Sequence, residues 1–347
     1  MPITIPALPG IKRIATEEAW APTTMLDAWR QLLQKKSFDD PGFQSMWGFF
    51  LNQNAGYTNG IIDRLQNLGA GRIADMDSAG IDMQLLLLTA PGVQVFDRDD
   101  ALAVARASND EVSEACSKYP TRFAALAAIP PQDPKAAAIE MERAIKQLGL
   151  KGVVINSHTK GEYLDDQKFW PIFEAAEALD AAIYIHPQTP PKNMSTEFIK
   201  RNLEGAIMGF AVEVALHVVA IVLSGAFERF PKLKIVIGHA GEGLPYWLYR
   251  LDHQQNVILG SMGANKLKRK ISEYVRDHVY VTTSGMGWEP AIMFCQQTMG
   301  VDHVLYAMDY PYQFVHDEVI THDKLPISTD ALRKLYQTNA ERIFHLS

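Results

Sequence analysis

Four residues that could bind a metal ion or transfer a proton stand at the ends of short apolar runs. They are Glu17 in IATEEAW, His186 in AIYIHP, His239 in KIVIGHAGE and Asp309 in VLYAMDYP. Carboxylate oxygens and imidazole nitrogens bind divalent ions such as Mn²⁺, Zn²⁺ and Mg²⁺. The same groups act as general acids and bases. The four residues therefore indicate a metal-centred reaction site, provided that the fold brings them together.

Each of these residues also has an ordinary structural explanation. An isolated histidine that ends a buried strand, such as His186, is often a hydrogen-bonded core residue, and Asp309 could cap the turn that follows it. His239 could be held by the backbone of its glycine-rich turn, and Glu17 and Glu18 could both be solvated. Four such coincidences at equivalent places of one fold are less plausible than one shared site, which favours the metal centre.

Eight β-rich runs alternate with helical patterns along the chain. The runs are Ile11–Glu17, Met83–Thr89, Phe123–Ile129, Gly152–Ser157, Ala182–His186, Lys234–His239, Val279–Ser284 and Val304–Asp309. Several are continuously apolar, as expected for strands covered on both faces. Helices are predicted, for example, over Ala101–Lys118, Pro134–Leu148 and Asp166–Leu179. Eight strand–helix units predict an α/β fold of the (β/α)₈ TIM-barrel type, with a doubly wound open sheet as the alternative.

Residues 1–347 are expected to form a single barrel domain, because no linker, repeat or low-complexity segment divides them. The stretch 22–81, between the first two strands, is too long for a normal connection, so we expect an inserted helical and loop segment at the active-site mouth. The reactive groups of such barrels lie at the carboxyl ends of the strands. Those ends carry Glu17, Thr89, Asn156 with His158, His186, His239, Ser284 and Asp309.

The composition excludes some classes of function. The chain has 347 residues and a formal net charge of −7, without a basic cluster, which argues against a nucleic-acid partner. Cys116 and Cys295 lie far apart, outside any metal-ligand spacing, and favour a reduced cytoplasmic protein. The most apolar stretch, 214–223, is too short to span a membrane and is expected to be a buried helix. His217 within it is expected to be a core histidine, whereas histidines outside the motifs, such as His322, are expected to be exposed.

The motifs TEEA (16–19), IHP (185–187), GHAGE (238–242) and MDYP (308–311) resemble those of the decarboxylase branch of the amidohydrolase superfamily, the amidohydrolase-2 or ACMSD-like family. The resemblance runs from about Ile14 to Ile343 and is closest to the 5-carboxyvanillate decarboxylases. It is carried by WGFF (47–50), RIADMDSAGID (72–82), TAPGVQ (89–94), INSHTKGEYLD (155–165), LPYWLYRLD (244–252), WEPAIMFCQQ (288–297) and YAMDYPYQ (306–313). Members of the family are metal-dependent, non-oxidative decarboxylases of aromatic acids.

The resemblance implies one divalent metal ion, Mn²⁺ in the first place, with Zn²⁺ or Mg²⁺ as alternatives. It implies that His239 lies beside the ion and contacts the substrate or a metal-bound water, and that Glu242 orients its neighbours. Arg250 would meet a carboxylate or oxygen of the substrate. The implied metal ligands are Glu17, His186 and Asp309. The implied pocket residues are Thr89, Phe210, Tyr312 and Tyr57.

Two departures from the superfamily argue against hydrolysis. Many members have a histidine two residues after the first ligand, where this chain has Ala19. A metal ion with three protein ligands and open positions is therefore expected. Hydrolytic members typically have a carboxylated lysine after the fourth strand, which binds a second metal ion. Lys151 stands at the wrong end of that strand and Lys160 lies in the loop beyond it, which disfavours a binuclear hydrolase.

A further departure concerns the substrate. An arginine suited to a second substrate carboxylate is expected after WGFF in the 5-carboxyvanillate enzymes. This chain has NQNAGYTNG (52–60) there, with Tyr57 near that place and no arginine before Arg64. The substitution argues against a dicarboxylate substrate and leaves a phenol with one carboxylate open.

The implied reaction is the non-oxidative decarboxylation of an ortho-hydroxy aromatic acid, such as 5-carboxyvanillate, 2,3-dihydroxybenzoate or γ-resorcylate. Direct loss of CO₂ would leave an in-plane carbanion that the ring cannot stabilise, so the carboxyl-bearing carbon must be protonated first. The metal would orient phenolate and carboxylate, and Asp309, or alternatively His239, would deliver the proton. The competing classes are a mononuclear metal-dependent hydrolase or hydratase of a lactone, amide or small acid, and a catalytically silent barrel. The family implies a homodimer or homotetramer whose other partner is the small aromatic acid.

Overall fold

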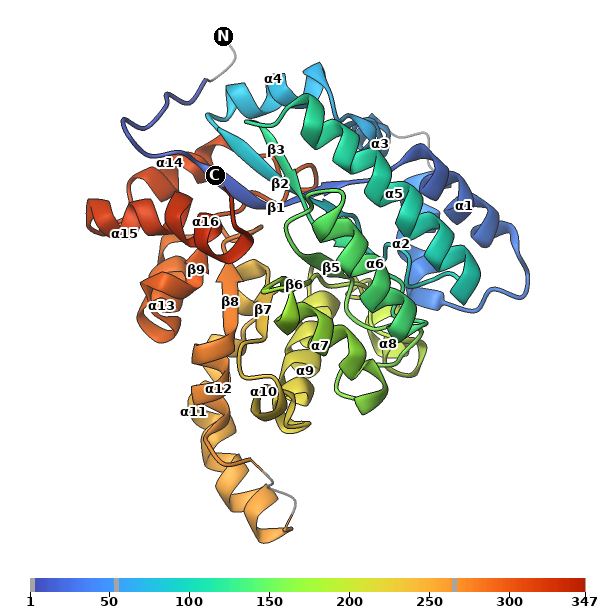
Figure 1. The fold of residues 1–347 in the computed structure, drawn as a ribbon, viewed down its shortest axis with the longest axis vertical. Coiled ribbons are helices and arrows are strands. Elements are labelled where there is room, and N and C mark those ends of the chain that lie inside the picture. Colours follow the sequence, from blue (N-terminus) through green and yellow to red (C-terminus); the bar gives the residue numbers. More distant parts are fainter. Residues whose placement is uncertain (1–3, 53–55, 264–266, 347) are drawn as a thin grey trace.

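The computed structural model describes residues 4–52, 56–263 and 267–346. Parallel strands form a barrel, and helices cover its outside (Figure 1). The strands are β1 (Ile14–Trp20), β2 (Met83–Leu88), β3 (Phe123–Ala125), β4 (Ala127–Ala128), β5 (Val153–Ile155), β6 (Ala182–Ile185), β7 (Lys234–Ile237), β8 (Val279–Thr282) and β9 (Val304–Leu305). The N–H of Thr16 donates to the carbonyl of Tyr306 at 3.0 Å, which joins β1 to the end of β9 and closes the ring. The predicted (β/α)₈ barrel is confirmed.

Two strands differ from the prediction. The third run is divided into β3 and β4 at Leu126, whose N–H bonds to Leu86, whereas the N–H of Ala127 bonds to Gly152 on the other side. The predicted bounds of the first strand are wrong by three residues at each end, because pairing with β2 runs from Ile14 to Trp20. Glu17 therefore lies within the strand and not at its end.

The helices follow the strands in alternation. They are α1 (Thr23–Gln34), α2 (Pro41–Asn52), α3 (Gly56–Gln66), α4 (Ala70–Ser78), α5 (Arg98–Lys118), α6 (Pro134–Lys146), α7 (Trp170–Ala178), α8 (Lys192–Ile199), α9 (Gly209–Leu223), α10 (Ala226–Arg229), α11 (Leu244–Gln254), α12 (Ile271–His278), α13 (Glu289–Met299), α14 (His316–Asp323), α15 (Thr329–Arg333) and α16 (Asn339–Phe344). Local sequence explains α6, where Asp133 accepts a hydrogen bond from the N–H of Ala136 and Pro134 takes the first helical position.

The inserted segment 22–81 consists of α1 to α4, apart from residues 53–55, which lie outside the described residues and include part of the NQNAGYTNG stretch. Helix α2 packs against the loop that follows β2. The indole N–H of Trp47 donates to the carbonyl of Ala90 at 3.1 Å, and the ring of Phe50 meets that of Tyr312 edge to face at 5.9 Å. The inserted segment thus packs against the loops that follow β2 and β9.

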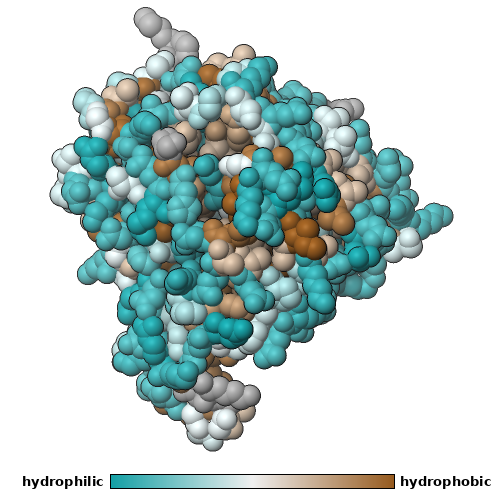
Figure 2. All heavy atoms as spheres, in the orientation of Figure 1, coloured by the Kyte–Doolittle hydropathy of each residue, from teal (hydrophilic) through white to brown (hydrophobic). Residues whose placement is uncertain are grey.

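Helix α11 and the π-helical turn after it extend away from the barrel (Figure 1). The surface on the face shown in Figure 2 is largely hydrophilic, with hydrophobic side chains in separate patches. No helix within the described ranges combines the length and apolarity needed to cross a bilayer. The apolar stretch predicted as a buried helix lies in α9, where His217 is fully buried. The expectation for His322 is wrong, because its side chain is also buried, against Tyr306.

Candidate metal centre

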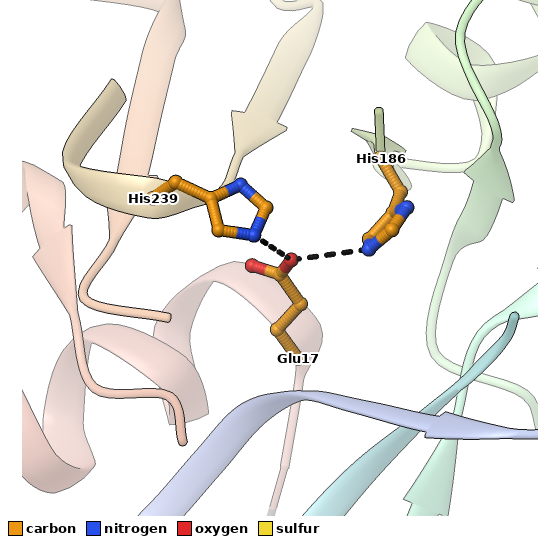
Figure 3. Close-up of side chains that lie close together, drawn as sticks. All are labelled: Glu17, His186 and His239. Carbon is orange, nitrogen blue, oxygen red and sulfur yellow. Dashed lines mark ion pairs between the residues drawn. The ribbon is translucent and has the colours of Figure 1, made fainter. Parts of the chain in front are cut away.

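Three side chains from separate strands converge in the barrel. Glu17 comes from β1, His186 directly follows β6, and His239 lies two residues beyond β7. Oε1 of Glu17 is 3.3 Å from Nε2 of His186 and 3.4 Å from Nε2 of His239 (Figure 3). All three atoms lie within 4.8 Å of one another, which is close enough for one ion to contact them all. The Glu17 side chain is 2% exposed and the histidine side chains 12% and 18% exposed, so the centre is buried but can be reached.

The hydrogen bonds around these side chains fit a bound cation. Nδ1 of His186 contacts the carbonyl of Pro187 at 2.8 Å, and Nδ1 of His239 contacts Oε1 of Glu242 at 2.5 Å. These bonds leave both Nε2 atoms facing the centre, as is typical of metal-binding histidines. Oε1 of Glu17 is buried and has no hydrogen-bond donor among the described residues. Burying such an oxygen is costly unless a cation compensates it, so the donor set suits a divalent ion.

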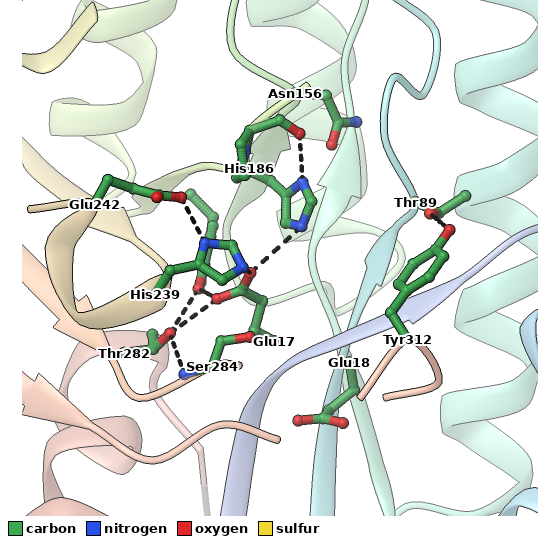
Figure 4. A network of polar contacts seen from close by, with 12 residues as sticks. Glu17, Glu18, Thr89, Asn156, His186, His239, Glu242, Thr282, Ser284 and Tyr312 are labelled. Carbon is green, nitrogen blue, oxygen red and sulfur yellow. Dashed lines mark hydrogen bonds and ion pairs between the residues drawn. The ribbon is translucent and has the colours of Figure 1, made fainter. Parts of the chain in front are cut away.

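The other oxygen of Glu17 is held firmly. Oε2 accepts a hydrogen bond from the hydroxyl of Thr282 at 2.8 Å (Figure 4). It also accepts one from the hydroxyl of Tyr184. Glu17 also lies in an irregular part of β1, because the register with β2 shifts between Ala15 and Glu18. A β-bulge of this kind turns a side chain away from the regular alternation and is frequent next to active sites.

Glu18 points away from the three converging side chains (Figure 4). It is fully buried and accepts hydrogen bonds from the N–H groups of Met308 at 2.9 Å and Tyr310 at 3.1 Å. Burial raises its pKa to about 8, although these hydrogen bonds and the charge of Arg72 oppose that effect. The expectation that Glu18 is structural agrees with these contacts.

Burial and neighbouring charges set the protonation of the site. Burial lowers the pKa of His186, and the carboxylate of Glu17 opposes that effect. Burial also acts to lower the pKa of His239, but the carboxylates of Glu242 and Glu17 outweigh it and hold this pKa well above its ordinary value. A metal ion at the centre would compete with the proton on His239, because metal ligands bind in their deprotonated form.

Asp309 lies beside this group but is not one of its three members. A Cβ atom added to Gly285 would lie 3.2 Å from Oδ2 of Asp309 and 3.4 Å from Cδ2 of His239, so both side chains border the same small space. The backbone of Asp309 has φ +72°, an unusual value for a residue with a side chain and one that recurs at functional sites. Burial holds the pKa of Asp309 well above its ordinary value, although the charge of His239 opposes that effect.

The residues expected to contact substrate differ in burial: some are buried, whereas Tyr57 and Arg250 are exposed. The hydroxyls of Thr89 and Tyr312 are hydrogen-bonded at 2.6 Å, and Phe210 is buried at the start of α9. Tyr57 lies on α3 and is 62% exposed. The pKa of Tyr312 is raised mainly by burial, with smaller contributions from Asp309 and Tyr57, so Tyr57 lies near Tyr312. Arg250 is exposed on α11 and forms no hydrogen bond or ion pair with the residues that the structure describes, so the single chain does not bring it to the centre.

Two other strand-end residues have separate partners. His158 is buried, with Nε2 3.0 Å from the carbonyl of Thr189 and Nδ1 accepting from the N–H of Gly161. The amide of Asn156 is buried near His186 and donates to the carbonyl of Leu88 at 3.4 Å (Figure 4). These contacts support the loop after β5, and neither residue belongs to the group of three.

Sequence reasoning missed Tyr184 and Thr282. One signal was present for each. Tyr184 precedes His186 by two residues, and side chains two apart along a strand point to the same face. Thr282 has the same relation to Ser284, which stands at a strand end. A polar residue two positions before a predicted ligand could therefore have been examined as its support.

Comparisons with known proteins agree with this geometry. The amidohydrolase family profile matches residues 61–346. A γ-resorcylate decarboxylase from Polaromonas sp. is 35% identical over 292 residues, which cover 82% of this chain and 89% of that protein.

Solved structures extend the comparison to almost the whole chain. A 5-carboxyvanillate decarboxylase from Novosphingobium aromaticivorans, crystallised with manganese and 3-methoxy-4-hydroxy-5-nitrobenzoic acid, is 44% identical. Its TM-score is 0.96, and the match covers 99% of this chain and all of that one. A dihydroxybenzoic acid decarboxylase from Polaromonas sp., crystallised with manganese and 2-nitroresorcinol, is 31% identical with a TM-score of 0.86, and the match covers 97% of each chain. The resemblance inferred from the motifs is confirmed, and the chain belongs to the amidohydrolase family.

Proposed function

We propose that the protein is a carboxy-lyase that removes CO₂, without oxidation, from an aromatic acid with a hydroxyl ortho to the carboxylate. The observation that carries the proposal is the convergence of Oε1 of Glu17 with Nε2 of His186 and of His239, which brings two of the proposed metal ligands together with the alternative proton donor. It is supported by the names of the relatives, which are decarboxylases of aromatic acids, and by the manganese in two of their structures. We assign Mn²⁺ to this centre, with Zn²⁺ and Mg²⁺ as the ions to compare.

When bound, the ion acts as a Lewis acid that orients phenolate and carboxylate together. Glu17, His186 and Asp309 would hold the ion as its protein ligands. Asp309 borders the same space as His239. It would give up its place at the ion to the phenolate oxygen of the substrate and, once protonated, would supply the proton to the carboxyl-bearing ring carbon. His239 is the alternative donor, and Glu242 fixes the orientation of its ring through Nδ1.

The proposed substrate pocket adjoins the inserted helices. The hydroxyl pair of Thr89 and Tyr312 offers hydrogen bonds to ring substituents, and Phe210 and Tyr57 supply aromatic surface. Arg250 is a proposed contact of a substrate carboxylate on the strength of the resemblance. The basic residue that follows the NQNAGYTNG stretch, Arg64, is paired with Asp75 at 3.1 Å. This pairing favours a substrate with one carboxylate over one with two.

A substrate panel tests the proposal. Metal-free protein is loaded with Mn²⁺ and mixed in D₂O with 5-carboxyvanillate, 2,3-dihydroxybenzoate or γ-resorcylate. Ultraviolet spectra follow the reaction, and mass spectrometry identifies the product. Decarboxylation predicts CO₂ release and a product with one deuterium on the ring, and only when metal is present. A product that has gained the elements of water would instead support a hydrolase or hydratase, and metal binding with no turnover of any substrate would refute the proposal.

We also propose that the protein works in the cytoplasm as a homodimer or homotetramer. The segment that extends away from the barrel, residues 244–263, exposes large apolar side chains. Tyr246, Tyr249 and Met262 within it are 77%, 86% and 72% exposed. Such a surface is typical of contacts between protein chains. Cys116 and Cys295 are free thiols, as suits a reducing compartment. Light scattering coupled to size-exclusion chromatography measures the assembly, and a monomer at micromolar concentration would contradict it.

A further inference from the structure

The buried hydroxyl groups of Tyr184 and Thr282 both donate hydrogen bonds to Oε2 of Glu17. The proposed reaction gives neither hydroxyl a role. We propose that Tyr184 and Thr282 are positioning residues that hold Glu17 so that it presents Oε1 alone to the metal ion. The proposal rests on the metal centre of the proposed function, but it does not depend on the substrate or the reaction. It assigns a task to two residues that have no part in the proposed reaction.

The contacts come from three strands of the barrel. The hydroxyls of Tyr184, on β6, and Thr282, on β8, both bond to Oε2 of Glu17, on β1. Their own oxygen atoms lie 3.1 Å apart, so the two groups lie against each other. Both side chains are completely buried. Because the strands form the rigid interior of the barrel, the two hydroxyl groups cannot move with the carboxylate if it rotates.

Without these two partners the carboxylate would be free to turn. The last torsion of a glutamate side chain has a broad, roughly two-fold distribution, so its two oxygens exchange readily in solvent. Turning Glu17 would break two hydrogen bonds to a charged oxygen, which are about twice as strong as bonds between neutral groups. The carboxylate also occupies the space in which a side chain of residue 238 would begin, since a Cβ added to Gly238 would lie only 2.4 Å from Oε2.

A carboxylate held in this way contributes one oxygen to the ion. Carboxylates bind metal ions through one or both oxygens, and the second mode occupies one more coordination position. The two hydroxyls exclude that mode for Glu17 and so preserve a position for the oxygens of the substrate. They also align Oε1 before the ion binds, and removing such outer partners typically weakens metal binding about 10- to 100-fold.

The test measures Mn²⁺ affinity of the full chain by electron paramagnetic resonance, from the signal of the free ion. Tyr184→Phe and Thr282→Val each remove one hydroxyl at nearly constant volume and should each raise the dissociation constant about 10-fold or more. The double variant should bind Mn²⁺ more weakly than either single variant. Thr282→Ser, which keeps a hydroxyl, should bind Mn²⁺ with an affinity close to that of wild type. The spectrum of bound Mn²⁺ should also change in Thr282→Val but not in Thr282→Ser.

Tyr336→Phe is the matched control. Tyr336 is also completely buried, and its hydroxyl donates to Asp323 at 2.8 Å, in a different polar cluster. The control should lose stability as Tyr184→Phe does, measured by melting of the metal-free proteins, yet keep wild-type Mn²⁺ affinity. If Tyr184→Phe does not fold, the pair Thr282→Val and Thr282→Ser decides the question. Equal Mn²⁺ affinity of Thr282→Val, Thr282→Ser and the control would overturn the proposal. Wild type that binds Mn²⁺ without decarboxylating any substrate would refute the proposed function and leave this inference standing.

Discussion

Replacing Gly238 by alanine should weaken metal binding strongly without altering any ligand. The added Cβ would lie 2.4 Å from Oε2, 2.7 Å from Oε1 and 2.9 Å from Cδ of Glu17. The backbone of Gly238, with φ −80° and ψ −171°, is open to any residue, so the space and not the conformation requires glycine. The three heavy atoms nearest to the added methyl group all belong to Glu17, so the perturbation acts first on that side chain.

The size of the effect follows from these distances. Ordinary contacts of a Cβ begin at 3.4 Å, so the carboxylate must retreat by about 1 Å. A retreat of that size lengthens the 2.8 Å bond from Thr282 beyond hydrogen-bonding range and also breaks the bond from Tyr184. Hydrogen bonds to charged groups contribute about 1.5–3 kcal/mol each, so the two together are worth about 3–6 kcal/mol. With the ligand oxygen displaced as well, Mn²⁺ affinity should fall about 100-fold or more.

The assay is the titration of metal-free Gly238→Ala with Mn²⁺, followed by decarboxylation kinetics at saturating metal. Gly205→Ala is the control, because a Cβ at that position meets no heavy atom within 4 Å. The control should match wild type in both measurements. A folded Gly238→Ala protein with wild-type Mn²⁺ affinity would show either that the turn after β7 yields at little cost or that Glu17 is not a ligand, and the reasoning would fail.

Asp309→Asn should lower kcat at least 1,000-fold, at the order expected for a lost proton donor, while a substrate analogue still binds in calorimetry; near-normal turnover would exclude this role. Glu242→Gln keeps an acceptor for His239 but removes its charge, and kcat at saturating Mn²⁺ should fall about 10-fold. Tyr312→Phe should raise KM more than it lowers kcat, because the bond to Thr89 positions the pocket wall and not the reacting carbon. Burial lowers the pKa of His322 to about 4, below the 6.5 of an exposed histidine. Its neutral form therefore stabilises the fold fully above pH 6.5, and this contribution is lost as the pH falls toward 4. Urea titrations should show wild type losing up to about 3 kcal/mol more than His322→Gln over that window, and parallel curves would contradict the assignment.

The sequence predicted the barrel because its signals are local. Each strand is a short apolar run, and each helix has its own periodicity, so the alternation can be counted without tertiary information. The ends of those runs also identified Glu17, His186, His239 and Asp309 as one group of candidates. The structure brings the first three together and places Asp309 beside them.

Other features depend on contacts between distant parts of the chain. The bonds from Tyr184 and Thr282 to Glu17 join residues 167 and 265 positions apart, and no local pattern encodes such pairs. His322 was misjudged for the same reason, since the sequence of α14 does not reveal that Tyr306 covers that side. Arg250 belongs to the motif LPYWLYRLD, and the resemblance implies that it contacts the substrate. In the single chain, however, it lies on the exposed surface of α11.

The adjacent glutamates of TEEAW show why a bulge in β1 matters. Neighbouring side chains of a regular strand point to opposite faces, which in a barrel are the interior and the layer of surrounding helices. Here both are buried: Glu17 reaches the metal centre, whereas Glu18 accepts the N–H groups of Met308 and Tyr310. Those two residues flank Asp309, whose backbone has the unusual φ of +72°. One short stretch of β1 therefore carries a proposed ligand in its first carboxylate and, with its second, supports the backbone that carries the proposed proton donor. The register shift of β1 lies between Ala15 and Glu18, so a change that removes it should disturb metal binding and proton delivery together.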